Sequence, residues 1–225
     1  MGHYARPKPL IDIKGRPMVS WALDSLKTID YEKVVFVALE EHEREFEVTS
    51  LLRELVPSAE VVLIPEVTSG QLCTVLAARS YLEEADDVLI CPSDTLIQSE
   101  LGAEIRERPE ECVGIISVKN MPGDRWSFAR VDDSGKVVEV AEKRRISNHA
   151  STGFYYFSKA SDLIDIGSKM VGSGDQTCGE YYVIPVYQKL IDEGGTVLLS
   201  SASEMYDMGS EEAKVLFERQ LNTDE

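Results

Sequence analysis

Two isolated aspartates follow apolar segments of the chain and could share a hard cation. Asp94 comes directly after the run Val88–Cys91, whose branched residues are typical of a buried strand. Asp207 stands in the apolar stretch Met205–Gly209. Carboxylate oxygens are the ligands that Mg²⁺ prefers, and Mg²⁺ shares them with substrate phosphates. The pair therefore indicates a magnesium site, with a turn- or helix-capping role for Asp94 as the plain alternative.

Two lysines have settings that suit phosphate groups. Lys8 lies between Pro7 and Pro9, which should hold the flanking backbone extended and present its charge from a stiff segment. Glu142 and Lys143 follow a predicted strand. Such a pair can divide the binding of a phosphorylated sugar, because the carboxylate accepts hydroxyl hydrogen bonds and the ammonium pairs with phosphate. A loop lysine and a surface ion pair are the plain alternatives.

A small polar turn at Thr68–Thr74 leads from a predicted strand into a predicted helix. Gly70 would let a ligand approach the backbone closely, and the free amides of a helix N-terminus favour an anion or the carbonyl oxygens of a base. Thr68 or Ser69 is expected to cap the helix. Many helix caps have this composition, so the turn by itself identifies no ligand.

The elements that must position these residues alternate in the first half of the chain. Apolar runs predict buried strands at Val34–Leu39, Val61–Ile64, Val88–Cys91 and Val113–Val118. Helical periodicity follows Pro17, spans Phe46–Leu55 and returns from Leu72 to Leu82. Alternation of this kind predicts an α/β fold, a Rossmann-like and mostly parallel sheet flanked by helices, with ligands beyond the carboxyl ends of the strands.

The pattern changes after about residue 120. Two strands flank Asp132–Gly135, a sequence that favours a tight reversal, so a β-hairpin and an antiparallel excursion are expected. The expected later elements are the hairpin strands Phe128–Val131 and Val137–Ala141, the strand Gly153–Phe157, and the helices Ala160–Met170, Tyr181–Asp192 and Glu211–Gln220. We expect residues 1–225 to form one domain.

Composition excludes several classes of protein. The 225 residues carry a net charge of -17, which argues against binding to nucleic acid or an anionic membrane. A hydrophobic content of 43% predicts a folded chain, and no apolar run is long enough for a membrane helix. Four scattered cysteines predict reduced thiols rather than disulfides or a zinc site. A cytosolic protein is therefore expected.

The order of several short motifs along the chain is more specific than any single motif. Along the chain stand P-K-P-L, G-R-P-M, T-S-G-Q, S-D, E-K, T-G-F-Y-Y-F, G-E-Y-Y and Y-D-M-G. Over about residues 5–210 this succession resembles the sugar-1-phosphate nucleotidyltransferases, the family of glucose-1-phosphate thymidylyltransferase. The resemblance implies a nucleotide-diphospho-sugar transferase fold, with a nucleotide-binding half at 5–120 and a sugar-binding half at 121–225.

Residue roles on the nucleotide side follow from that resemblance. It implies that Lys8 contacts the nucleotide phosphates and that Gly70 and Gln71 lie against the nucleobase. It also implies that Asp94 and Asp207 bind Mg²⁺. The implied reaction joins a nucleoside triphosphate to a sugar-1-phosphate and releases pyrophosphate, so positioning and charge neutralisation would supply most of the catalysis.

Roles on the sugar side are implied in the same way. Glu142 would meet sugar hydroxyls and Lys143 the sugar phosphate, while Gly153 and Glu180 would line the sugar pocket. Lys8, Asp94 and Lys143 would then form the catalytic group. The implied partners are the two substrates, with no nucleic acid and no membrane; the base, the sugar and homo-oligomerisation are left open.

The chain departs from the family pattern in three places. The family begins with a strand and a Gly-rich loop, L-A-G-G-x-G-x-R, whereas six residues precede P-K here. Ser93 replaces the glycine usual before the metal-binding aspartate, and Trp126 with Ser127 replaces a Tyr-Gly pair. The glutamine that reads the base has no match near Pro65. We expect the backbone edges beside the absent strand to be exposed or paired otherwise, and the triphosphate to lack its anion nest.

Three interpretations follow from these departures. The first is an active enzyme whose start is mis-assigned or truncated. The second is a noncatalytic nucleotide- or sugar-binding regulatory relative. The third, within the enzyme class, is a cytidylyltransferase acting on another phosphorylated alcohol.

Overall fold

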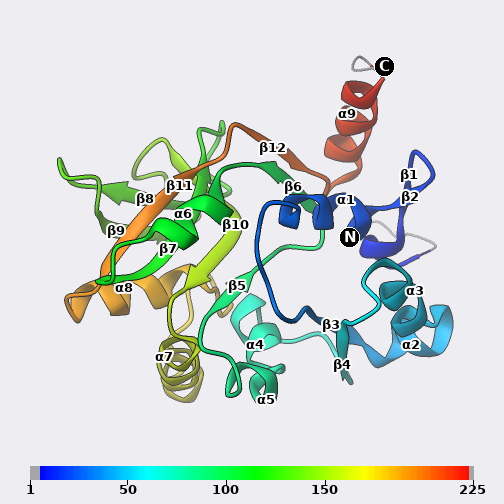
Figure 1. The fold of residues 1–225 in the computed structure, drawn as a ribbon, viewed down its shortest axis with the longest axis horizontal. Coiled ribbons are helices and arrows are strands. Elements are labelled where there is room, and N and C mark those ends of the chain that lie inside the picture. The colour runs from blue at the N-terminus through cyan, green and yellow to red at the C-terminus, as the bar shows by residue number, and fades with distance from the viewer. Residues whose placement is uncertain (1–5, 223–225) are drawn as a thin grey trace.

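The central sheet of the protein has six strands (Figure 1). The structure is a computed structural model and describes residues 6–222. The strand order is β11-β7-β10-β8-β9, and β5 also pairs with β10. The bounds are β5 Val88–Ile90, β7 Cys112–Lys119, β8 Ser127–Val131, β9 Val137–Glu142, β10 His149–Phe157 and β11 Thr196–Ser201. β10 lies at the centre because its start pairs with β8 and its end with β5.

The fold class is α/β with flanking helices, as predicted, but the central sheet is mixed rather than mostly parallel. Within the described residues, parallel pairing is confined to β11 with β7 and to β3 (Val35–Leu39) with β4 (Glu60–Ile64). The predicted hairpin forms β8 and β9, and β10 continues it in antiparallel fashion. Because this antiparallel excursion reaches the centre of the sheet, fewer strand pairs are parallel than the sequence indicates.

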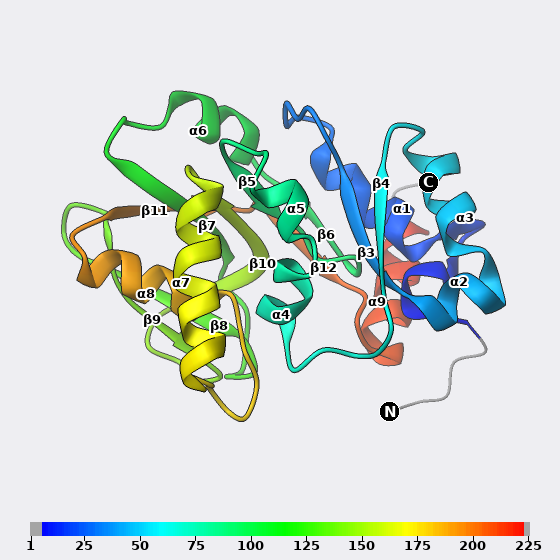
Figure 2. The same ribbon diagram turned by 90° about the horizontal axis from the view of Figure 1, so that it is seen from below.

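Helices cover both faces of the central sheet. α7 (Ala160–Ser173) and α8 (Ile184–Asp192) lie on one face, and α6 (Leu101–Glu107) lies on the other (Figures 1 and 2). Neighbouring residues of a strand point to opposite faces. Ile116 of β7 therefore joins the core under α7 and α8, while Ile115 joins the core under α6. Both cores exclude water from the sheet.

A second, two-stranded parallel sheet formed by β3 and β4 lies beside the first helices (Figure 2). Val48 and Leu52 of α3 pack with Val19 of α1 and Phe36 of β3. The helix predicted over 46–55 is divided because Glu47 takes a left-handed conformation, φ +51°. The helices of this first half are α1 Met18–Leu23, α2 Glu40–Phe46, α3 Val48–Leu55, α4 Gln71–Leu76 and α5 Arg79–Leu82.

The last helix of the described chain packs against its first segments. Trp21 of α1 meets Phe217 of α9 (Glu211–Leu221) edge to face, with ring centroids 5.3 Å apart. Ile13 and Met18 belong to the same cluster. The remaining short elements are η1 Lys8–Leu10, β1 Asp12–Ile13, β2 Arg16–Pro17, η2 Asp24–Leu26, β6 Thr95–Gln98 and β12 Glu204–Asp207. Segments far apart in sequence thus meet where β6 and β12 pair.

Most of the predicted elements are confirmed, with shifts at their ends. The helix expected from Leu72 to Leu82 is divided into α4 and α5. All four cysteines are free thiols, as predicted. Among residues 6–222, no helix combines the length and the apolar character needed to cross a membrane.

Candidate active site

Asp94 and Asp207 lie together at one end of the β6–β12 pair. Asp207 is opposite Thr95, the first residue of β6, and Asp94 directly precedes that strand. The N–H of Met208 donates to the carbonyl oxygen of Asp94 at 2.8 Å. A Cβ placed on Gly209 would lie 3.0 Å from Oδ1 of Asp207 and 3.0 Å from Oδ2 of Asp94. The structure thus brings the two predicted metal ligands together across this glycine.

Lys8 reaches the same place from the start of the described chain. It begins the 3-10 turn η1, so the extended backbone predicted on both sides of Lys8 is present only at Pro7, with φ -53° and ψ 142°. Pro9 tolerates the turn because the fixed φ of proline suits the first residues of a helix. The Lys8 ammonium donates to the carbonyl oxygen of Gly209 at 2.7 Å. Lys8 therefore places a positive charge beside the two carboxylates.

Burial and two neighbouring charges of opposite sign shift the pKa of Asp94. Burial raises the pKa of Asp94, the Asp207 carboxylate raises it further, and the Lys8 ammonium lowers it. Asp207 also accepts a hydrogen bond from the N–H of Gly209 at 2.8 Å. A cation shared between the two carboxylates would relieve their mutual repulsion.

The residues fit the predicted cation as a partial ligand set. Two carboxylates provide oxygen ligands of the kind that Mg²⁺ binds. Within residues 6–222, no group of three or more His, Cys, Asp or Glu side chains is placed to hold a metal ion. A cation at Asp94 and Asp207 would therefore take its other ligands from water and substrate phosphates, as Mg²⁺ commonly does.

The predicted sugar-binding residues form a second polar cluster. Glu142 ends β9, and its carboxylate accepts a hydrogen bond from the hydroxyl of Ser127. Lys143 follows in a left-handed conformation, φ +50°, and its ammonium donates to the hydroxyl of Tyr182. That hydroxyl donates in turn to the carboxylate of Glu180. Three of the residues predicted on the sugar side thus share one neighbourhood.

Burial and the hydrogen bond with Tyr182 have the largest effects on the pKa values of Glu142 and Lys143, respectively. Burial raises the pKa of Glu142, and the Ser127 hydroxyl and the Lys143 ammonium oppose that shift. The hydrogen bond with Tyr182 raises the pKa of Lys143. Glu142 and Lys143 bond different partners, so the arrangement differs from a simple surface ion pair.

The loop between β7 and β8 connects the two clusters. Arg125 donates to Oδ2 of Asp207 at 2.6 Å, and two residues later Ser127 donates to Glu142. Trp126 lies between them, and its ring stacks with the Arg125 guanidinium at 4.0 Å. The loop thus contacts both clusters, the first through Arg125 and the second through Ser127.

Sequence reasoning missed three contributors to the site. Tyr155 donates to the Ser127 hydroxyl at 3.4 Å, and Tyr182 bridges Lys143 and Glu180. Both tyrosines stand in the motifs T-G-F-Y-Y-F and G-E-Y-Y, where a polar tip on an apolar ring was the available signal. Arg125 gave no signal because its loop has no periodic pattern.

Gly153 packs against the turn that carries Asp94. It has φ +88° and lies in the irregular part of β10 between Ser151 and Tyr155. A Cβ there would lie 3.1 Å from Cγ of Pro92, two residues before Asp94. This packing accounts for a glycine at the position, and a contact between Gly153 and a sugar stays a prediction.

Gly70 and Gln71 mark the start of α4. The predicted cap is wrong: Gly70 holds the cap position, and the hydroxyl of Thr68 donates to its carbonyl oxygen at 2.9 Å. Ser69 does not cap the helix with its side chain either. Gly70 has φ +136°, and a Cβ there would lie 2.5 Å from the carbonyl oxygen of Tyr181. The nucleobase contacts of Gly70 and Gln71 stay a prediction.

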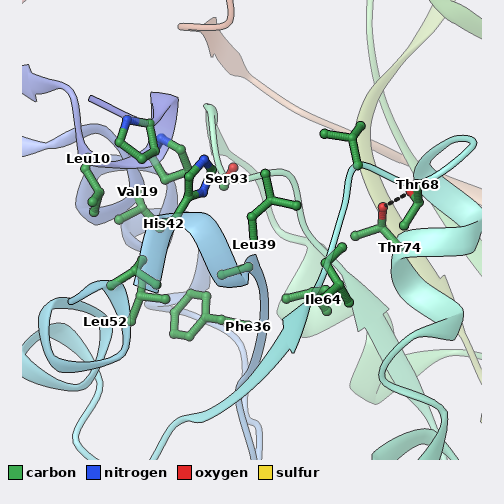
Figure 3. A pocket seen from close by; sticks show the side chains of 16 residues that line it. Leu10, Val19, Phe36, Leu39, His42, Leu52, Ile64, Thr68, Thr74 and Ser93 are labelled. Atoms are coloured by element: carbon green, nitrogen blue, oxygen red, sulfur yellow. Dashed lines mark hydrogen bonds between the residues drawn. The ribbon is translucent and has the colours of Figure 1, made fainter. Parts of the chain in front are cut away.

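An apolar groove of about 270 Å³ lies beside β3 (Figure 3). Its walls include Phe36 and Leu39 of β3, and Ser93 contributes from the turn that carries Asp94. Thr68 and Thr74 contribute hydroxyls that are 2.6 Å apart. The groove is thus bordered by neighbours of the predicted nucleotide-binding residues rather than by those residues themselves.

Within residues 6–222, β3, which lines this groove, and β5 of the central sheet each have one edge without a partner strand. In the described part of the chain, β3 pairs only with β4 and β5 pairs only with β10. Each of these strands therefore keeps one edge without a strand partner.

Residues 1–148, more than half of the chain, match the MobA-like NTP transferase domain. The chain belongs to this family. The match includes both Lys8 with Asp94 and Glu142 with Lys143, so it spans residues of both clusters. Membership of an NTP transferase family confirms the nucleotidyltransferase resemblance that the ordered motifs carry.

Two curated relatives illustrate what this chain is similar to. Bifunctional protein GlmU of Thermotoga petrophila is 26% identical over 185 residues, which cover 79% of this chain and 39% of GlmU. A 2-aminoethylphosphonate cytidylyltransferase of Lancefieldella rimae is 30% identical over 154 residues, which cover 68% of this chain and 58% of that enzyme. The chain spans less than two thirds of either relative.

A solved structure confirms the fold. The nucleoside-diphosphate-sugar pyrophosphorylase of Vibrio cholerae RC9 superposes with a TM-score of 0.81 and 23% sequence identity. The superposition covers 97% of this chain and 93% of that one. The expected nucleotide-diphospho-sugar transferase fold is therefore present over almost the whole chain.

Proposed function

We propose that this member of the MobA-like NTP transferase family joins a nucleoside triphosphate to a sugar-1-phosphate, giving a nucleotide sugar and pyrophosphate. The observation that carries the proposal is the adjacency of the two polar clusters. Lys8, Asp94 and Asp207 suit a polyphosphate with its cation. Glu142 and Lys143 suit a phosphorylated sugar, and one loop contacts both groups.

In the proposed reaction an oxygen of the sugar phosphate attacks the α-phosphorus of the triphosphate. A new phosphorus–oxygen bond forms there, the bond to the bridging oxygen breaks, and pyrophosphate leaves with that oxygen. Lys8 would lie against the nucleotide phosphates and Lys143 against the sugar phosphate, which orients and neutralises both. Mg²⁺ held by Asp94 and Asp207 would supply further charge neutralisation.

Both halves of the chain have a part in this proposal. Residues 5–120 would hold the nucleotide and residues 121–225 the sugar. The remaining contacts would be those of the base with Gly70 and Gln71, and of the sugar with Glu142, Gly153 and Glu180. A cytoplasmic location is part of the same proposal, since nucleoside triphosphates are the substrates.

Pyrophosphate release tests the proposal. The 225-residue chain, and a second form extended by the in-frame codons upstream of Met1, are incubated with Mg²⁺ and a panel of nucleoside triphosphates paired with sugar-1-phosphates. We expect release that requires both substrates and stops when EDTA removes the cation. Absence of release from both forms with every pair would contradict the proposal.

A cytidylyltransferase acting on another phosphorylated alcohol is a second candidate. The similarity to the 2-aminoethylphosphonate cytidylyltransferase favours it. Pairing CTP with phosphocholine and with 2-aminoethylphosphonate in the same panel separates the two candidates. Release with these pairs, and none with sugar-1-phosphates, would select the second.

A noncatalytic nucleotide- or sugar-binding relative is the third candidate. Calorimetry with a nucleotide sugar is the discriminating measurement, because binding without turnover by either form of the chain would select this candidate.

Replacing Tyr182 by Phe should weaken the sugar side of the site. The hydroxyl contacts both Lys143 and Glu180, and a hydrogen bond to a charged group is worth about 1.5–3 kcal/mol. We expect the KM for the sugar phosphate to rise about tenfold, with little change in kcat. Steady-state kinetics measure this, with Tyr31→Phe as the exposed control. An unchanged KM would remove Tyr182 from the site.

A further inference from the structure

Arg125 is paired with Asp207, one of the two carboxylates that would bind the proposed cation. Its guanidinium donates to Oδ2 of Asp207 at 2.6 Å, while Oδ1 accepts the N–H of Gly209 at 2.8 Å. The Arg125 side chain is 60% exposed and that of Asp207 15% exposed. Both oxygens of Asp207 thus already have donors, and a divalent cation binding at Oδ2 would compete with the more exposed partner, Arg125.

The loop that presents Arg125 is held at its base. Arg145, from the basic cluster after β9, donates to the carbonyl oxygens of Met121 and Gly123, both at 2.8 Å. The indole N–H of Trp126 bonds within the same loop, and its ring supports the Arg125 guanidinium at 4.0 Å. A fixed base with an exposed arginine allows the side chain to turn without moving the backbone.

The position of this loop also places Arg125 next to the expected phosphates. Arg125 contacts the predicted metal-site carboxylate, and Ser127 contacts Glu142 of the sugar cluster. The phosphates of the two substrates must meet between these clusters. A guanidinium matches phosphate oxygens with two parallel hydrogen bonds and keeps its charge at all relevant pH values.

We propose that Arg125 is a phosphate-binding residue that Asp207 holds until a divalent cation displaces it. The proposal rests on the proposed function, which supplies the cation and the phosphates. A cation at Asp207 repels the guanidinium, and a phosphate beside it provides a new anionic partner. Exchange of partners would therefore couple cation binding to phosphate binding.

Mn²⁺ titration followed by electron paramagnetic resonance tests the first half of the exchange. Without substrate, Arg125→Gln should bind Mn²⁺ about three- to tenfold more tightly than the wild type, because a competing cation is removed. Arg106→Gln is the matched control, since Arg106 also pairs with an aspartate, Asp30, at 3.0 Å on an exposed surface. An Arg125→Gln affinity equal to that of the wild type, or weaker, overturns the proposal.

Pyrophosphate binding tests the second half. With Mn²⁺ saturating, Arg125→Gln should bind inorganic pyrophosphate about tenfold more weakly than the wild type and the Arg106 control. Unchanged pyrophosphate binding overturns the phosphate-binding role.

The variant Asp94→Asn distinguishes failure of the proposed metal site from failure of the Arg125 proposal. If Mn²⁺ binds the wild type and Asp94→Asn equally, the metal site of the proposed function fails. If Asp94→Asn loses Mn²⁺ while Arg125→Gln binds it as the wild type does, the Arg125 proposal alone fails.

Discussion

Replacing Asp94 by Asn should reduce Mg²⁺-dependent nucleotidyl transfer about 10²- to 10³-fold, because a bound cation contributes several kcal/mol of charge stabilisation and each 1.36 kcal/mol is tenfold in rate. Asp94 shares the neighbourhood of Asp207 and Lys8, and an amide provides a poorer cation ligand than a carboxylate. The value of kcat/KM from pyrophosphate release measures the effect. Activity within threefold of wild type would remove Asp94 from the metal site.

The same substitution should stabilise the folded chain in the absence of cations. Burial, and after it Asp207, raises the pKa of Asp94 above its ordinary value of 3.8. The folded state then binds the Asp94 proton more tightly than the unfolded state, so stability falls as the pH rises from 3.8 to the folded pKa. An uncharged amide avoids that loss, so in EDTA Asp94→Asn should have the higher Tm at neutral pH.

Asp132→Asn is the control with the opposite sign. Hydrogen bonding by Ser134 lowers the pKa of Asp132, so its carboxylate favours the folded state above the ordinary pKa, and this variant should have the lower Tm at neutral pH. A lower Tm for Asp94→Asn than for wild type would contradict the assignment of Asp94 as a partly buried carboxylate whose charge destabilises the fold when no cation is bound. Loss of activity together with a raised Tm would also show that the activity is not lost through unfolding.

Replacing Gly70 by Ala should destabilise the fold by about 3–5 kcal/mol, which is large for a single residue. Gly70 has φ +136° and ψ 172°, a region that only glycine adopts readily. A Cβ would lie 2.5 Å from the carbonyl oxygen and 2.6 Å from the nitrogen of Tyr181. That backbone is fixed, because Tyr181 bonds Ser69 and Leu72 on either side of the glycine. Denaturant unfolding measures the loss.

Gly135→Ala is the matched control for this prediction. Gly135 has φ +83°, but a Cβ there meets nothing within 4 Å, so only the cost of the left-handed conformation remains, about 1–2 kcal/mol. Equal losses for the two variants would show that the approach of Tyr181 is unimportant. A large difference would give Gly70 a structural reason that is independent of any nucleobase.

For the pair Asp94 and Asp207, local sequence predicts the candidate residues but not the strand pairing that brings them together. Asp94 was identifiable because it follows a run of branched apolar residues, and a cation shared with Asp207 was a hypothesis from the two isolated carboxylates that the family resemblance also implied. The pairing of β6 with β12 that brings them together was not predicted. Both strands are short, and the residues that pair lie more than one hundred positions apart, so no local periodicity marks them.

Residues that act through loops were harder to find than those at strand ends. Glu142 and Lys143 could be placed because β9 ends there. Arg125 and Tyr182 could not, because their contacts depend on where a loop and a helix start come to rest against distant elements. The resemblance to the nucleotidyltransferase family implied roles only for residues that match a family motif. Arg125 matches none of the motifs that carry the resemblance.

Direct observation of the product by ³¹P nuclear magnetic resonance tests the central claim, that the Lys8–Asp94–Asp207 cluster and the Glu142–Lys143 cluster together join two phosphorylated substrates. With Mg²⁺ and the preferred substrate pair, the wild type should give the paired signals of a new pyrophosphate diester together with free pyrophosphate. Asp94→Asn should give neither over the same time. No diester from the wild type with any pair, or equal diester from Asp94→Asn, would contradict the account.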